Sequence, residues 1–76
     1  MSVFLLTFDR SKHRLVRLEE FPANARLQAE DARFQAELEA LRSGEDIEVV
    51  TLEADSLDTL KKTHGSYFPE TLPLTV

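Results

Sequence analysis

The chain has 76 residues, which is enough for one small domain and no more. Hydrophobic residues make up 42% and charged residues 30%, a globular composition that argues against intrinsic disorder. The net charge of −5 disfavours general binding to nucleic acid phosphates, and the lack of cysteine excludes disulfides, thiolate metal sites and cysteine catalysis.

The first two predicted elements form a β-hairpin. Residues 3–8, VFLLTF, are nearly all apolar and too few for a helix, and residues 15–21, LVRLEEF, partly alternate in polarity. Residues 9–14 between them are polar and predict a loop of about five residues. So short a connection makes the two strands antiparallel neighbours.

A helix is predicted next, over residues 25–41, which are rich in Ala, Leu, Glu, Gln and Arg. Pro22 ends the preceding strand, Asn24 is the expected N-cap, and Ser43-Gly44 is the expected stop. One apolar stripe runs along the helix at helical spacing and comprises Leu27, Phe34, Leu38 and Leu41. Such a stripe is typical of the helix face that packs against a core.

A third strand is predicted over residues 47–53, IEVVTLE, and a short second helix over residues 56–64, capped by Asp55 or Ser56. The order ββαβα predicts an α+β fold, with a three-stranded, mainly antiparallel sheet packed with two helices. The first strand is the most apolar, so we expect it in the centre, with strand order 2-1-3.

The chain is expected to divide into a single domain and a tail. The domain covers residues 1–68, and residues 69–76 contain two prolines and no helical period. The tail is either docked through Leu72 and Leu74 or frayed.

The basic residues gather near the N-terminus. Residues 1–17 hold four Lys or Arg and one Asp, a net charge of +3, whereas the rest of the chain carries −8. A basic hairpin tip is a candidate surface for an acidic protein or a phosphate backbone. The same side chains equally fit a solvated strand edge that resists aggregation. The candidate partner-binding residues are Arg10, Lys12, His13, Arg14 and Arg17.

An acidic surface on the predicted first helix is the alternative contact site. It comprises Glu30, Glu37 and Glu39. Carboxylates of this kind suit a basic partner surface, so the protein could act as an acidic antagonist of a nucleic-acid-binding protein.

Catalytic and cofactor-binding motifs are not found in the sequence. Gly44 and Gly65 are the only glycines, so neither GxGxxG nor a P-loop can form. His13 and His64 lie far apart and in no ligand-spaced cluster, so no metal site is predicted. His64 is the one candidate general base, but the sequence places no nucleophile or carboxylate beside it. We expect no enzyme, cofactor or metal; a small enzyme centred on His64 is the remaining alternative.

The sequence as a whole predicts a small non-enzymatic interaction or regulatory protein that binds a macromolecular partner. Another protein is the expected partner, and nucleic acid bound by the basic hairpin is the alternative. So short a chain buries a limited core, which favours a homodimer. No targeting segment and no apolar run long enough for a membrane span is visible, so we expect a cytoplasmic protein without a membrane partner.

Overall fold

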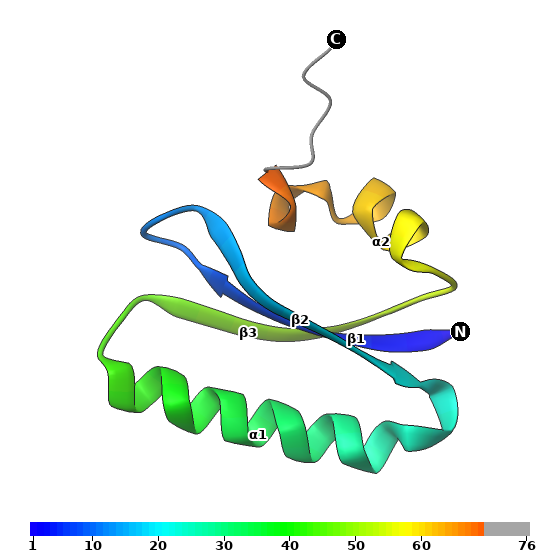
Figure 1. Cartoon of the computed structure of the whole chain (residues 1–76), viewed down its shortest axis with the longest axis horizontal. Helices are drawn as coiled ribbons and strands as arrows, with labels where there is room; N and C mark the ends of the chain where they lie inside the picture. Colours follow the sequence, from blue (N-terminus) through cyan, green and yellow to red (C-terminus); the bar gives the residue numbers. More distant parts are fainter. Residues whose placement is uncertain (70–76) are drawn as a thin grey trace, which may run out of the picture.

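The computed structural model describes residues 1–69, and residues 70–76, including Leu72 and Leu74 of the predicted tail, lie outside the described part. The elements in chain order are β1 (Ser2–Asp9), β2 (Arg14–Pro22), η1 (Ala23–Ala25), α1 (Arg26–Ser43), β3 (Ile47–Ala54), α2 (Leu57–Thr63) and η2 (Gly65–Tyr67). The sheet has the order β2-β1-β3, and β1 is antiparallel to both neighbours. These findings confirm the predicted α+β fold and strand order. Figure 1 shows the sheet between α1 on one side and α2 on the other.

Strand β1 is the centre of the molecule, because it is buried on both of its faces. Side chains alternate across a strand, so Phe4 and Leu6 face α2 while Val3 and Leu5 face α1. All four are at most 4% exposed. This explains why the sequence of β1 is almost continuously apolar rather than alternating.

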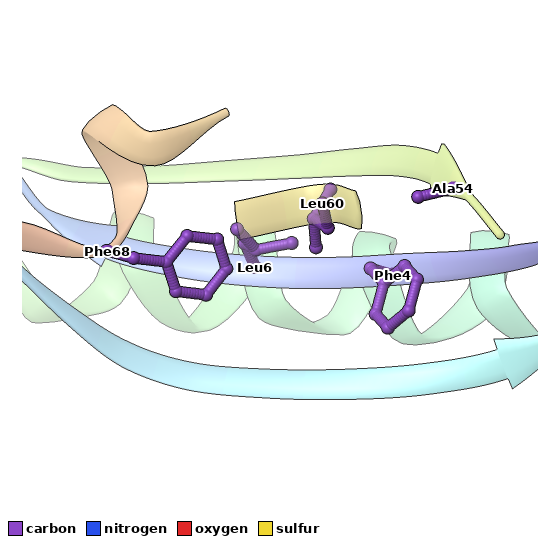
Figure 2. Packing of buried hydrophobic residues seen from close by; sticks show 5 residues of the cluster. All are labelled: Phe4, Leu6, Ala54, Leu60 and Phe68. Carbon is purple, nitrogen blue, oxygen red and sulfur yellow. The ribbon is translucent and has the colours of Figure 1, made fainter. Parts of the chain in front are cut away.

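The main hydrophobic core lies between the sheet and α2. Figure 2 shows how its buried members point toward one another, and they are Phe4, Leu6, Ala54, Leu60 and Phe68. The start of α2 is fixed as predicted by Ser56, whose Oγ accepts a hydrogen bond from the Thr59 N–H at 3.1 Å. The turn η2 then carries Phe68 back onto the sheet.

Helix α1 packs on the opposite face of the sheet through alanines. Ala29 is its one fully buried residue, and Ala32, Ala36 and Ala40 are half-buried on the same face. Together with Ala25 they recur every three or four residues, which keeps them on one line of the helix. Their methyl groups fill little space, so this layer of the core is thin.

The apolar stripe predicted for α1 lies on the other side of the helix and faces away from the sheet. Leu27, Phe34 and Leu41 are 84%, 56% and 79% exposed, and Leu38 is half-buried. The expectation that this stripe packs on the core is therefore wrong. The physical reason is that the alanine row has the same helical period and occupies the inward face.

The beginning of α1 also differs from the prediction. Asn24 lies inside the single 3-10 turn η1, and the N-cap position of α1 is Ala25, which provides no side-chain hydrogen bond. The first helical turn is instead tied to the sheet by an ion pair between Arg26 and Glu53 of β3. The C-terminal end of α1 follows the prediction, since Gly44 adopts a left-handed conformation with φ 71°.

The hairpin loop between β1 and β2 covers residues 10–13, one fewer than expected. The buried Asp9 organises it: Oδ1 accepts hydrogen bonds from the Ser11 N–H at 3.0 Å, the Ser11 hydroxyl at 2.7 Å and the Lys12 N–H at 3.1 Å. The Ser11 hydroxyl, followed by the Lys12 N–H, lowers the pKa of Asp9 below 3.8. His13 completes the turn in the left-handed region, with φ 54°.

Asp9→Asn is expected to destabilise the fold at neutral pH, because three donors then face an uncharged acceptor. The folded-state pKa of Asp9 is lowered, so the contribution of its carboxylate is present above pH 3.8 and is lost as the pH falls through the lower folded value. Thermal unfolding followed by circular dichroism from pH 7 to pH 2 should show the Tm gap between wild type and variant closing in acid. Glu20→Gln, on an exposed position of β2, is the matched control. A gap that stays constant with pH would contradict this role of Asp9.

The orientation of α1 predicts that enlarging a small inward-facing residue lowers stability more than truncating a large outward-facing one. Ala29→Leu adds three carbons to a closed contact and is expected to lower the free energy of unfolding by about 1–3 kcal/mol. Leu27→Ala removes the same atoms from an exposed position and should change it by less than about 0.5 kcal/mol. Urea denaturation at low micromolar protein measures both. A larger loss for Leu27→Ala than for Ala29→Leu would mean that the stripe packs on the sheet after all.

Candidate functional site

Two arginines of the basic hairpin are paired with the protein's own carboxylates. Arg10 Nε donates to Asp46 Oδ1 at 3.0 Å, and the Arg10 N–H donates to the Asp46 carbonyl oxygen at 3.0 Å. Arg17 Nε lies 3.5 Å from Glu19 Oε1 on the same strand. Asp46 precedes β3, so the Arg10 pair connects the hairpin to the far edge of the sheet. Part of the positive charge of the cluster is thereby neutralised within the fold.

The other three candidate residues of the hairpin are exposed. The His13 ring packs edge-on against Phe8, with 5.6 Å between the ring centroids. The Lys12 N–H is bound by Asp9, and Arg14 begins β2 opposite Asp9. The structure therefore gathers four of the five predicted basic residues at the hairpin tip, while Arg17 lies farther along β2 opposite Thr7. Lys12 projects from the loop, and the imidazole of His13 packs on Phe8.

The three glutamates of the alternative acidic surface lie on two different flanks of α1. Glu30 and Glu37 flank Arg33, at 3.6 Å from its Nη1 and 3.4 Å from its Nε respectively. Glu37 faces the β3 side of the sheet, whereas Glu39 lines a groove on the β2 side. The structure brings Glu30 and Glu37 together and separates Glu39 from them.

His64 ends helix α2 and is half-buried. Its N–H donates to the Leu60 carbonyl at 2.8 Å and its carbonyl accepts from the Tyr67 N–H at 3.1 Å. Within residues 1–69 the imidazole makes no hydrogen bond or ion pair. The nearby Tyr67 hydroxyl donates to Glu48 Oε2 at 2.7 Å instead, and this bond, with burial, raises the pKa of Tyr67 above 10.0. A phenol held in this way is a packing and hydrogen-bonding group at neutral pH.

Metal-binding and membrane-spanning features are not found among the described residues. In that part of the chain, no three His, Asp or Glu side chains are placed to hold a metal ion. Neither α1 nor α2 is both long and apolar enough to cross a bilayer. Helix α1 has the length, but seven of its 18 residues are charged.

The α1 stripe, defined as Leu27, Phe34, Leu38 and Leu41, holds three of the five large hydrophobic residues that are exposed in the described chain. Leu27, Phe34 and Leu41 are seven residues apart, so they stay nearly in line over four turns of helix. In Figure 1, α1 runs along the lower edge of the molecule, and no other described segment covers its outer side. Contiguous exposed apolar side chains of this kind mark interaction surfaces in small soluble domains.

Two grooves flank α1 where it lies over the sheet. The larger, of about 470 Å³, opens toward β2 and is lined by Ala36, Ala40, Val16 and Arg17 among others. The smaller, of about 420 Å³, opens toward β3 between Ala40 and Val49. They arise because the alanine row holds the helix to the sheet without filling the space on either side. Both carry carboxylates at their rims, including Glu39 and Glu37 respectively.

The sequence pattern picks out the residues of the α1 stripe but predicts that they pack on the core. The signal that could have corrected this is the alanine row itself, Ala25, Ala29, Ala32, Ala36 and Ala40, which has the same period on the opposite face. Two faces of α1 therefore each have the spacing expected of the face that packs on the sheet. The arrangement that results offers a contact surface rather than a set of reacting groups.

Known proteins give no further assignment of this surface. The chain matches no protein-family model, no curated protein and no solved structure.

Proposed function

We propose that this is a small, non-enzymatic interaction protein that binds a protein partner through the α1 stripe. The exposure of Leu27, Phe34 and Leu41 on one face of one helix carries the proposal. Burying one such side chain is worth about 1.5–3 kcal/mol, so a partner that covers all three gains a substantial part of a binding free energy.

The surroundings of the α1 stripe support the same proposal. Phe34 lies in the middle of the stripe, where interfaces most often place an aromatic anchor. Polar side chains border it along both sides of the helix, and they are Glu30, Asp31, Gln35, Glu37 and Arg42. An apolar centre with a polar rim is the usual anatomy of a protein interface.

The basic hairpin supports a partner site less strongly. Arg10 and Arg17 already have carboxylate partners, so an acidic protein or a nucleic acid has to compete with Asp46 and Glu19 for them. Binding of that kind relies on charge and weakens steeply with salt. Apolar contact through the α1 stripe is, in contrast, nearly independent of salt. Salt dependence therefore separates the two surfaces.

The proposal predicts that a photo-crosslinking residue at position 34 captures a protein in living cells. Phe34 is replaced by benzoylphenylalanine, a change of similar shape on an exposed site, in cells that express the chain. Ultraviolet light should then produce a discrete adduct on a denaturing gel. The matched control carries the same residue at Lys62, an exposed position of α2, and should produce none. No adduct at position 34, with the variant folded by circular dichroism, would overturn the proposal.

A further inference from the structure

We infer that the occupant of the α1 stripe is a second copy of this chain, with the two α1 helices antiparallel about a two-fold axis near Ala36. The inference rests on the proposed function and names the partner of that same surface. It is carried by the order of apolar and charged residues along the outer face of α1. A two-fold pair requires this face to be complementary to itself.

Phe34 and Leu38 of the stripe meet across the axis in this arrangement, whereas Leu27 lies opposite position 45, beyond the end of α1. Leu27, Phe34 and Leu41 occupy one position of a seven-residue repeat, and Asp31 and Leu38 occupy the position four residues later. In an antiparallel pair these two positions oppose each other. Phe34 of each copy then packs on Leu38 of the other, on both sides of the axis near Ala36. Leu41 of each copy lies opposite Asp31 of the other.

Asp31 determines the direction of the pair. It borders the α1 stripe at the same heptad position as Leu38, and in a parallel pair it would face Asp31 of the other copy, which is unfavourable. In the antiparallel pair Asp31 lies beside Arg42 of the other copy, because both are on the same rim and lie at nearly equal distances from Ala36. Symmetry makes this two ion pairs. The antiparallel pair thus brings opposite charges together, whereas the parallel pair would bring like charges together.

The ion pairs that α1 makes within a single copy agree with this antiparallel pairing. The described chain pairs Arg26 with Glu53 and places Arg33 between Glu30 and Glu37. Within residues 1–69, Asp31 and Arg42 make no ion pair. The two charges that the structure leaves available on the outer face are therefore the two that the antiparallel pair joins.

The opposite rim sets a limit on the strength of the pair. Glu37 of one copy approaches Glu37 of the other near the axis, and Arg33 beside each of them offsets part of that repulsion. A helix of 18 residues is about 27 Å long, so one helix pair buries less than the roughly 1,600 Å² of a standard stable interface. We expect a reversible dimer with a Kd on the order of micromolar to tens of micromolar.

A charge swap tests the arrangement in the purified full chain by sedimentation equilibrium. Asp31→Arg and Arg42→Asp should each raise the dimer Kd by about tenfold, because each turns two attractive pairs into repulsive ones. The double variant carrying both changes should return to within about threefold of wild type, since it restores opposite charges. Glu39→Arg, a charge reversal off the stripe, is the matched control and should leave the Kd nearly unchanged. A double variant as weak as the single ones would overturn the pairing.

Cysteine crosslinking fixes the direction, because the chain has no cysteine of its own. In an equimolar mixture of Phe34→Cys and Leu38→Cys chains, the mixed disulfide-linked dimer should form under mild oxidation, because position 34 of one copy lies opposite position 38 of the other. Leu27→Cys lies about 27 Å from its counterpart in the antiparallel pair and should not form a disulfide. A parallel pair, in which each position of the stripe faces its own counterpart, would crosslink Leu27→Cys and would overturn the inference.

The outcome also separates this inference from the proposed function. A purified wild-type chain that stays monomeric at about 1 mM, while benzoylphenylalanine at position 34 captures a different protein in cells, rejects the second copy and keeps the proposed function. A monomer without any adduct at position 34 rejects both. A dimer whose Kd responds to the charge swap supports both.

Discussion

The contact between the alanine face of α1 and the sheet is the constraint on which the rest of the structure depends. It covers Val3 and Leu5 with methyl groups, so β1 is buried on both faces while the helix keeps its large side chains for the outside. The two layers of the molecule are therefore unequal. Large residues such as Phe4 and Leu60 fill the layer under α2, and small ones fill the layer under α1.

The sequence predicts the elements and their order well, because those depend on local signals. The apolar run of β1, the break at Pro22 and the left-handed Gly44 each act within a few residues. The inward face of α1 could not be predicted in the same way. Alanine and leucine both favour a helix, and both rows have its period, so periodicity defines two faces without ranking them. The ranking depends on the space above Val3 and Leu5, which is a property of the assembled sheet.

The candidate site likewise has one part that local sequence predicts and one part that only the tertiary fold determines. The sequence correctly groups the basic residues at one hairpin, because neighbours in a short loop stay neighbours in space. The pair between Arg10 and Asp46 joins positions 36 residues apart, and no local sequence pattern predicts it. The separation of Glu39 from Glu37 follows from two residues of helix rotation and becomes visible only once the sheet defines an inside. Charge can thus be located from sequence, whereas its pairing requires the tertiary fold.

A helix held mainly by methyl groups has a consequence for how the molecule opens. Lifting α1 from the sheet exposes Val3 and Leu5 but leaves the layer with Leu60 and Phe68 closed, so α1 can open as a local unit. Its amide hydrogens should exchange through this opening well before those of β1. Any partner that clamps the outer face also holds the inner face against the sheet, because one rigid helix carries both. Order in this helix then rises with the concentration of whatever binds it, so the thin layer couples folding to association.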